Sequence, residues 1–357
     1  MGMDTAWPIS GGHLFGVVDV ELTNRCNAHC SFCPRDATPH QGVMTPAVFA
    51  RVLDRVIEFR DAAAGVLPDT ATVSFCGLGE QLLNGDVSDF VSELRDAGLK
   101  SVVNTNAALL DDTRGRALLH AGLGTLVING GELGDDYETT YRLPFGRTRD
   151  NVARFVELAG DRCRVFVVLV DHTGDPDHVA EVEAFWRQLG VFRFFRLDLL
   201  NRAGSLPLES MHYDDDSRPD RVDELWRTTA AGAMCDAPFQ FPFIGYDGSY
   251  YLCSSDWQKE VSFGTVFDFS MVDVMAAKLA RVTSRSPICR NCNHDPLNQL
   301  ADRARAVDEG RSTETELVAL AEALAQRTTN LDQVLELLAV PRSDPVPDRR
   351  LIPVAAR

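Results

Sequence analysis

Residues 21–34 have the sequence Glu-Leu-Thr-Asn-Arg-Cys-Asn-Ala-His-Cys-Ser-Phe-Cys-Pro, and the apolar run at 17–22 predicts a β-strand directly before the cysteines. Cys26, Cys30 and Cys33 are therefore spaced C-x-x-x-C-x-x-C. Thiolate ligands select iron–sulfur clusters, zinc or Cu(I). A [4Fe–4S] cube needs four ligands, so three cysteines would leave one iron open for substrate chemistry. On this stretch alone, a zinc site or a chance grouping is the alternative.

Helices and strands are expected to alternate after this cysteine loop. Thr45 and Pro46 have the residue types preferred at a helix N-cap and first helical position, and apolar residues then recur at helical spacing. Further helices are expected over 86–97, 114–121, 150–158 and 179–189, and further strands over 71–76, 101–104, 125–128, 165–170 and 194–197. Six β/α alternations predict right-handed parallel units in an α/β fold.

The second expected strand ends in Ser-Phe-Cys-Gly-Leu-Gly-Glu-Gln over 74–81. Gly77 and Gly79 allow close backbone approach, and the Glu80 carboxylate can accept hydrogen bonds from an ammonium group. Taken alone, this Gly-x-Gly-Glu turn also suits an ordinary strand-to-helix loop. Its position one β/α unit after the cysteines favours a ligand-binding role.

These features together resemble the radical S-adenosylmethionine (SAM) family. The cysteine spacing, Phe32 before the third cysteine and the Gly-x-Gly-Glu segment carry the resemblance, with Gln81 where proline is usual. The resemblance implies a partial (β/α)6 TIM barrel with its chemistry at the C-terminal ends of the strands. It also implies a catalytic [4Fe–4S] cluster on Cys26, Cys30 and Cys33. SAM would bind the open iron and be cleaved to a 5′-deoxyadenosyl radical.

The resemblance further implies a set of SAM-binding residues. The turn from Asn104 to Asn106 is similar to the family's T-N-G turn, with Ala107 in place of glycine, and both asparagines either bind SAM or substrate or only cap the turn. The arginines after the fourth strand that can hold the SAM carboxylate are Arg142, Arg147 and Arg149. The cofactor-binding set is Phe32, Gly77, Gly79, Glu80, Asn104, Asn106, Asn129 and Arg142.

A second group of cysteines follows the barrel: Cys235, Cys253, Cys289 and Cys292. Asp247-Gly248 between alternating apolar residues predicts a β-hairpin before the second of them. Four thiolates saturate one cluster or one zinc ion, and spacing alone does not decide between them. Beside a radical SAM core, the order resembles the twitch module, an abbreviated SPASM domain with one auxiliary [4Fe–4S] cluster. The pattern is most similar to aminocyclitol dehydrogenases of the butirosin-pathway type.

Three regions are expected from this pattern. Residues 1–210 would form the radical SAM barrel core, 211–300 the hairpin-containing auxiliary cluster domain, and 301–357 a helical C-terminal extension. In the extension, helices are expected over 315–325 and 331–339, the second capped by Asn330, before a loose proline-rich tail.

Charge and cysteine usage narrow the class of protein. The formal net charge of −17 opposes binding to phosphate backbones, so no nucleic-acid partner is expected. No apolar run reaches the length of a membrane span and no export signal is present, which predicts a cytoplasmic protein without a membrane partner. A reducing cytosol disfavours disulfides. Of the two remaining cysteines, Cys163 is expected to be a buried core residue, and Cys76 either packs in the core or donates a hydrogen atom to a substrate radical.

The predicted reaction is removal of a carbon-bound hydrogen from a small polar metabolite, followed by electron loss to the auxiliary cluster. An alcohol of an aminocyclitol or amino sugar would become a ketone, with a flavodoxin or ferredoxin-type protein as reductant. Arg202 and Cys76 are the candidate catalytic residues, and Asp198 and Asn201 are weaker candidates for substrate contact.

Two rivals differ in class from this prediction. One is a radical SAM maturase that crosslinks or epimerises a peptide, although the residues before the first strand are too few for the leader-recognition domain of many such enzymes. The other is a zinc-stabilised binding protein without redox chemistry. Iron and sulfide analysis separates the second rival from both enzymes.

Overall fold

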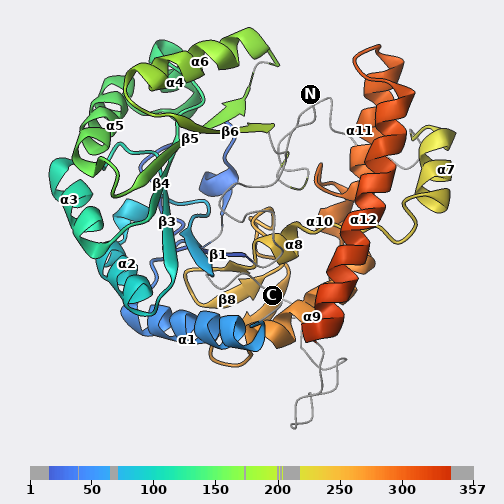
Figure 1. Cartoon of the computed structure of the whole chain (residues 1–357), viewed down its shortest axis with the longest axis horizontal. Helices are drawn as coiled ribbons and strands as arrows, with labels where there is room; N and C mark the ends of the chain where they lie inside the picture. The colour runs from blue at the N-terminus through green and yellow to red at the C-terminus, as the bar shows by residue number, and fades with distance from the viewer. Residues whose placement is uncertain are drawn as a thin grey trace.

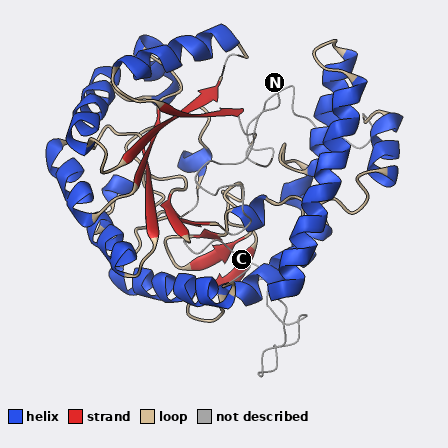
Figure 2. Ribbon diagram, in the orientation of Figure 1, coloured by secondary structure: helices blue, strands red, loops and turns tan. Residues whose placement is uncertain are grey.

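The computed structural model describes residues 16–38, 40–64, 71–172, 174–198, 201, 203 and 218–338. Six parallel strands lie in the order β6-β5-β4-β3-β2-β1 and confirm the predicted α/β partial barrel. The strands curve inside a ring of helices (Figure 2). They are β1 (Val17–Val20), β2 (Thr72–Phe75), β3 (Lys100–Thr105), β4 (Thr125–Asn129), β5 (Arg164–Asp171) and β6 (Arg193–Asp198).

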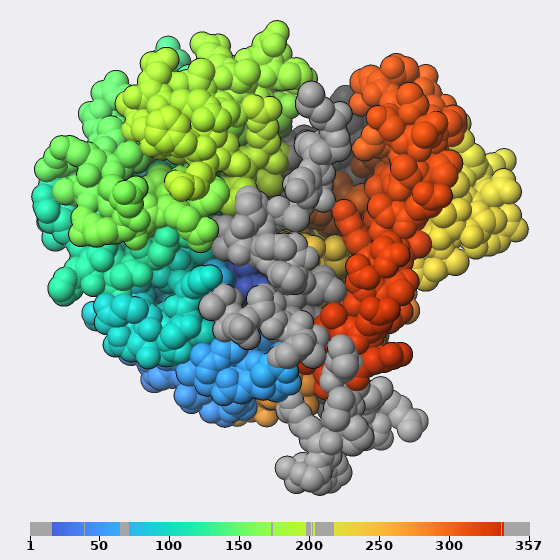
Figure 3. Space-filling model, viewed as in Figure 1, coloured from blue at the N-terminus to red at the C-terminus, as the bar shows by residue number. Residues whose placement is uncertain are grey.

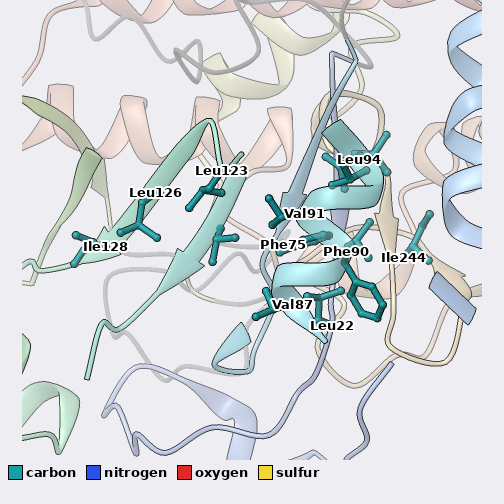
Figure 4. Packing of buried hydrophobic residues seen from close by; sticks show 14 of the residues in the cluster. Leu22, Phe75, Val87, Phe90, Val91, Leu94, Leu123, Leu126, Ile128 and Ile244 are labelled. Carbon is teal, nitrogen blue, oxygen red and sulfur yellow. The ribbon is translucent and has the colours of Figure 1, made fainter. Parts of the chain in front are cut away.

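Helices cover the outer face of these strands (Figure 1). They are α1 (Pro46–Ala62), α2 (Val87–Asp96), α3 (Asp112–Ala121), α4 (Gly134–Tyr141), α5 (Phe145–Ala159) and α6 (Pro176–Gln188). The short 3-10 helices η1 (Pro34–Ala37) and η2 (Gln81–Leu83) lie in the segments after β1 and β2. Thr45 caps α1 as predicted, since its side chain accepts from the Val48 N–H at 3.4 Å. The main core fills the space between strands and helices, as around Phe75 and Phe90 in Figure 4. Cys163 lies in this core, as predicted.

The inner face of the barrel has two different surfaces. A separate apolar cluster from β3 to β6 includes Val102, Phe166 and Phe195, and the rings of the two phenylalanines stack with centroids 4.7 Å apart. On β1 the apolar residues on either side of Asp19 belong to the main core, so the side chain of Asp19 projects to the inner face. Ser74 is its register partner on β2. The inner face is therefore polar over β1 and β2 and apolar farther round the barrel.

The predicted hairpin is confirmed and continues the barrel sheet. Strand β7 (Phe243–Ile244) pairs parallel to β1, and β8 (Ser249–Tyr251) and β9 (Ser262–Thr265) follow antiparallel, giving one nine-stranded sheet. The turn lies at Asp247-Gly248, where Gly248 has a φ of +80° and the Asp247 carboxylate accepts from the Ser249 N–H at 3.0 Å. The predicted boundary near residue 210 stays a prediction.

The C-terminal helices are α7 (Asp220–Thr228), α8 (Ala237–Gln240), α9 (Met271–Thr283), α10 (Pro287–Arg290), α11 (Pro296–Asp308) and α12 (Glu314–Leu338). The predicted helix break at Asn330 is wrong. Inside the continuous α12 the Asn330 side-chain oxygen accepts from Gln326 at 3.0 Å, one turn earlier, and does not cap a new helix. The expected loose tail lies outside the described residues.

Helices α7, α11 and α12 share a small core of their own, and they stand on the side of the molecule opposite α3 (Figure 3). Leu331 of α12 belongs to the main core, so this helix packs against the rest of the chain. Among the described residues, no helix has the length and apolar character needed to cross a membrane.

Candidate active site

Cys26, Cys30 and Cys33 lie in the loop between β1 and η1, at the C-terminal end of the barrel strands, and all three are half-buried free thiols. Burial raises the pKa of Cys26 and of Cys30, and the charge of Cys33 adds to both shifts, so the three sulfurs lie within electrostatic reach of one another. The Ala28 N–H donates to the Cys26 sulfur at 3.4 Å. Hydrogen bonds to sulfur stabilise thiolate ligands. These positions fit three thiolates of one iron–sulfur cluster.

Arg35 organises this loop from within. Its side chain is only 8% exposed, donates to the Ala28 carbonyl oxygen at 3.1 Å and pairs with Asp36. The positive charge of Arg35 lowers the pKa of Cys26 and of Cys30, against the larger effect of burial. The guanidinium therefore favours the thiolate forms that a cluster requires.

The loop after β2 packs directly on the cysteine loop. A Cβ atom at Gly79 would lie 2.0 Å from the Thr23 carbonyl oxygen and 2.7 Å from that of Arg25. The Glu80 N–H donates to the same Arg25 oxygen at 2.9 Å. Gly77 has a φ of +124°, a conformation that side chains with a Cβ rarely adopt. Both glycines allow close approach as predicted, but the structure shows approach to the neighbouring loop and to the Glu21 side chain.

Glu80 joins this loop to the end of β3. It is 1% exposed, and its carboxylate accepts from the Thr105 hydroxyl at 2.7 Å, the Asn106 N–H at 2.8 Å and the Leu82 N–H at 3.1 Å. Burial raises the pKa of Glu80, and these three donors lower it. The predicted contact between Glu80 and the SAM ammonium stays a prediction.

Asn106 contacts the cysteine loop and also caps its own turn. Its amide nitrogen lies 3.8 Å from the Cys26 sulfur and donates to Asn27 at 2.9 Å, while its amide oxygen accepts from the Ala108 N–H at 3.0 Å. The structure therefore shows the capping role, and contact of Asn106 with SAM or substrate stays a prediction. Ala107 has a φ of +58°, which explains why glycine suits this position.

The C-terminal end of α4 closes another side of the cysteine loop. The Cys30 sulfur lies 3.9 Å from the Tyr141 carbonyl oxygen. Phe32 packs edge-on against Tyr141, with centroids 5.5 Å apart, and lies 4.7 Å from the His172 ring. Arg142 follows in a left-handed conformation with φ +55° and is exposed. Phe32 and Arg142 are thus brought beside the cysteines, and their contact with SAM stays a prediction.

The second cysteine group also converges. Burial raises the pKa of all four thiols, and the charge of Cys292 raises those of Cys235, Cys253 and Cys289 further. The His294 N–H donates to the Cys292 sulfur at 3.5 Å. Among the described residues, no three His, Cys, Asp or Glu side chains are arranged to hold a single metal ion. The cysteine sulfurs that hold a [4Fe–4S] cluster bind separate irons. The cysteine sulfurs that hold one zinc ion share that ion and lie roughly 4 Å apart.

Asparagines hold the C-x-x-C loop in place. The Asn298 amide donates to the Cys292 and Arg290 carbonyl oxygens, both at 2.8 Å. The Asn201 amide, from the segment after β6, donates to the Asn291 carbonyl oxygen at 2.7 Å. Asn201 is therefore a tie between the barrel and the auxiliary cysteines. Arg202, the predicted catalytic residue beside it, lies outside the described residues.

A cavity of about 200 Å³ lies between the loop after β2 and the loop after Cys253. The loop after β2 contributes Cys76, Gly77 and Leu78 to its wall, and the loop that follows Cys253 contributes Ser254. Its charged lining residues are Asp19, Glu21, Asp256 and Lys259. Cys76 is half-buried and lines this cavity, and its role stays a prediction.

Residues 20–185 match the family model of the radical SAM superfamily. The chain carries a radical SAM domain. Residues 235–293 match a second family model, the iron-sulfur cluster-binding domain SPASM. These matches confirm the family resemblance and the predicted cofactors, SAM and [4Fe–4S] clusters. The radical SAM domain begins at β1 and ends within α6.

Solved structures that share the fold of this chain include two with a TM-score of 0.56, and a third is similar with a lower score. The enzyme anSMEcpe with bound AdoMet is 14% identical, with a TM-score of 0.56 over 90% of this chain and 98% of that chain. SuiB of Streptococcus suis, bound to its precursor peptide SuiA, is 14% identical with a TM-score of 0.56 over 85% and 76%. BtrN in complex with AdoMet and 2-DOIA is 17% identical with a TM-score of 0.49 over 79% and 94%. At these identities the likeness concerns the fold alone.

A curated relative is similar over part of this chain. It is the tungsten-containing aldehyde ferredoxin oxidoreductase cofactor-modifying protein of Pyrococcus furiosus, 28% identical over 105 residues. The match covers 29% of this chain and 27% of that protein.

Four residues near the radical SAM site were not expected from the sequence: Asp19, Arg35, Glu132 and His172. Asp19 alternates with apolar Val18 and Val20, and that alternation was the available signal. The buried Glu132 pairs with His178 at 2.6 Å, and the His172 Nε2 atom is buried without a hydrogen-bond partner among the described residues. No local pattern predicts the positions of Arg35 and His172, because the burial of both side chains depends on tertiary contacts.

Proposed function

We propose that this chain is a radical SAM dehydrogenase that oxidises an alcohol of a small polar metabolite, an aminocyclitol or an amino sugar. The observation that carries the proposal is the acidic cavity between the loop after β2 and the loop after Cys253. Three carboxylates and one ammonium line it, which favours a substrate that carries an amino group. A substrate there would lie between the proposed SAM segment and an auxiliary cluster ligand.

The cofactors supply the two redox halves of this reaction. When bound, SAM would supply a 5′-deoxyadenosyl radical able to take a carbon-bound hydrogen, and the auxiliary cluster would supply an acceptor for one electron. In the proposal Cys26, Cys30 and Cys33 hold the first cluster, and Cys235, Cys253, Cys289 and Cys292 hold the second. Gly77, Gly79 and Glu80 shape the SAM segment, and a flavodoxin or ferredoxin-type protein delivers electrons.

The size and lining of the cavity support a small metabolite as substrate. At about 200 Å³ the cavity is smaller than the roughly 300–1,000 Å³ of drug-sized sites. Lys259 pairs with Glu21 and lies 4.4 Å from the Tyr246 ring centroid, so the cavity wall is held by its own contacts. A sugar-sized ligand suits this space.

Peptide modification is the second candidate. The fold likeness to SuiB, a protein seen with its precursor peptide, covers 85% of this chain and supports it. A peptide side chain could also reach an acidic cavity, so substrates of both kinds belong in the same screen.

The test is a substrate screen with anaerobically reconstituted protein, SAM and strong reductant. Candidate aminocyclitols, amino sugars and peptides are compared by release of 5′-deoxyadenosine and by mass spectrometry of the product. The proposal predicts a ketone two hydrogens lighter than one of the amino-bearing metabolites. Turnover of peptides alone would contradict it. Iron and sulfide content, measured first, tests the zinc-protein rival.

A further inference from the structure

Asp19 is a carboxylate placed deep in the barrel that still contacts the cavity. It lies on the inner face of β1, with Ser74 of β2 as its register partner, and it is one of the residues that line the cavity. Protein surrounds it on every other side, yet part of its surface is accessible from the cavity. A ligand in the cavity can therefore reach it while bulk water cannot surround it.

The other two cavity carboxylates already have strong partners. Glu21 pairs with the Lys259 ammonium and accepts from the Leu78 N–H at 3.2 Å. Asp256 accepts from the N–H groups of Glu260 and Val261 at 3.0 Å and 2.9 Å. The Glu21 carboxylate is thus engaged by a salt bridge and a backbone donor, and the Asp256 carboxylate is engaged by two backbone donors.

Asp19 has weaker partners of a different kind. The side chains of Cys76 and Ser74 are its neighbours, close enough for hydrogen bonding to affect its pKa. The Ser74 hydroxyl oxygen in turn accepts from the Asn104 amide at 3.0 Å. A thiol and a hydroxyl orient a carboxylate without neutralising it. The network fixes the direction of Asp19 and leaves it able to take up a proton.

We propose that Asp19 is the catalytic base that accepts the hydroxyl proton of the substrate alcohol. This inference rests on the proposed dehydrogenase. In the step, the substrate O–H bond breaks and an O–H bond to the Asp19 carboxylate forms. The carbon-bound hydrogen atom goes to the 5′ carbon of the deoxyadenosyl group, and one electron goes to the auxiliary [4Fe–4S] cluster as oxidant. Loss of a hydrogen atom, a proton and an electron converts the alcohol into the ketone.

The surroundings of Asp19 give it a suitable basicity. Burial raises its pKa to about 6, and the hydrogen bonds from Cys76 and Ser74 and the charge of Lys278 lower it only in part. A base with a pKa near the working pH transfers protons efficiently. The charged or titratable groups that face it from the packed elements are Glu21, Cys76, Asp256, Lys259 and Lys278.

Cys76 acquires a different role in this arrangement. A dehydrogenase returns no hydrogen atom to its substrate radical, so the reaction needs no thiol as a donor. Burial raises the pKa of Cys76 well above its ordinary value, and the Asp19 charge adds to this, so the thiol stays protonated and can donate to Asp19. Cys76 is thus a positioning residue for the base.

The first test separates hydrogen abstraction from proton removal. With a substrate deuterated at the reacting carbon, Asp19→Asn should still place deuterium in 5′-deoxyadenosine but make at least about 100-fold less ketone, the usual size of a general-base contribution. Asp89→Asn, an exposed substitution of the same kind on α2, should match the wild type. Normal ketone formation by Asp19→Asn would overturn the inference. So would an equal loss of both products that high substrate concentration restores, because that pattern marks a binding residue.

The pH dependence of ketone formation tests which protonation state of Asp19 is active. Because the carboxylate form is the base, ketone per 5′-deoxyadenosine should rise with pH around a midpoint near 6 in the wild type. Asp19→Asn should lose this rise, and Cys76→Ser, which keeps a donor, should keep it. A rise that persists in Asp19→Asn would assign the base to another group.

The second test needs no turnover. Infrared difference spectra of the cluster-loaded protein, without SAM or substrate, should show a carboxylic acid band that disappears around pH 6 and is missing in Asp19→Asn. An unchanged band in the variant overturns the inference by itself. If the wild type makes no ketone from any candidate, the proposed function fails and the catalytic assignment fails with it. If only the variant comparison fails, the dehydrogenase stands and Asp19 is not its base.

Discussion

At the scale of single residues, Gly79 decides how closely the two active-site loops approach. The position of a Cβ there is occupied by the Thr23 carbonyl oxygen, which is backbone and cannot swing away as a side chain could. The cysteine loop and the SAM segment therefore share one geometry. A shift in either loop changes the other.

Gly79→Ala should separate the loops and reduce SAM cleavage by about 100-fold, a loss typical of displacing a site by about 1 Å. Gly85→Ala is the matched control, because nothing lies within 4 Å of its Cβ position. The measurements are SAM affinity by equilibrium dialysis and the rate of 5′-deoxyadenosine release. Wild-type values in Gly79→Ala would show that the loops move independently.

Glu80→Ala should weaken SAM binding with both clusters intact, and it should also destabilise the fold. Three buried donors from Leu82, Thr105 and Asn106 lose their acceptor, and each unsatisfied group costs roughly 1–3 kcal/mol. Thermal unfolding and SAM binding check the two effects. Glu322→Ala, exposed on α12, is the control. A variant with full stability and affinity would leave Glu80 without either role.

At the scale of elements, α9 delivers a buried ammonium to the region between the barrel and the auxiliary cysteines. Lys278 is 0% exposed, and its Nζ has no hydrogen-bond partner among the described residues. Burial lowers its pKa to about 7, while the charges of Cys253, Asp256 and Asp19 raise it. An unpaired buried charge is costly, so a nearby anion is the natural counterpart. A thiolate-bound cluster at Cys253 would be such an anion.

Lys278→Met should lower the reduction potential of the auxiliary cluster by tens of millivolts, the order of one Coulomb interaction at an effective dielectric constant near 20. The sign follows because a positive charge stabilises the more negative, reduced cluster. An EPR-monitored redox titration of the cluster-loaded protein measures it. Lys100→Met, exposed on β3, should leave the potential unchanged. Equal potentials in Lys278→Met and the wild type would contradict the expectation.

The sequence predicted those motifs and turns that depend on residues close together in the chain. The cysteine spacings, the Gly-x-Gly-Glu turn and the Asp247-Gly248 hairpin each carry their own signal. Gly77 of the turn and Phe243 of the first hairpin strand line the cavity. Helix α4 was missed because Tyr137 and Tyr141 are its only buried residues. The sequence analysis did not predict that the two-residue strand β7 pairs with β1. Pairing between strands far apart in the sequence is not encoded in a local residue pattern.

At the scale of the whole molecule, one sheet connects the radical SAM barrel to the hairpin of the auxiliary region. Asn201 adds a second tie, from the end of the barrel to the C-x-x-C loop. The two cluster sites are therefore parts of one framework. The predicted division into 1–210, 211–300 and 301–357 stays a prediction, as do the reductant and the cytoplasmic location.

Replacing Cys26, Cys30 and Cys33 together by alanine should remove about half of the bound iron and all SAM cleavage, because the other four thiolates hold their cluster independently. Cys163→Ala, in the barrel core, should keep full iron content and so controls for loss of a thiol. Iron analysis and 5′-deoxyadenosine release check both variants. SAM cleavage by the triple variant would end the radical interpretation of this loop.

The fate of the substrate electron tests the proposed dehydrogenation most directly. The measurement is the ratio of ketone to 5′-deoxyadenosine, compared between the wild type and Cys289→Ala with Cys292→Ala, using the substrate found in the screen. The wild type should form the two products in equal amounts. The folded double variant should still release 5′-deoxyadenosine but make little or no ketone, because the electron has lost its acceptor. An unchanged ratio in a folded variant that lacks the auxiliary cluster would contradict the account.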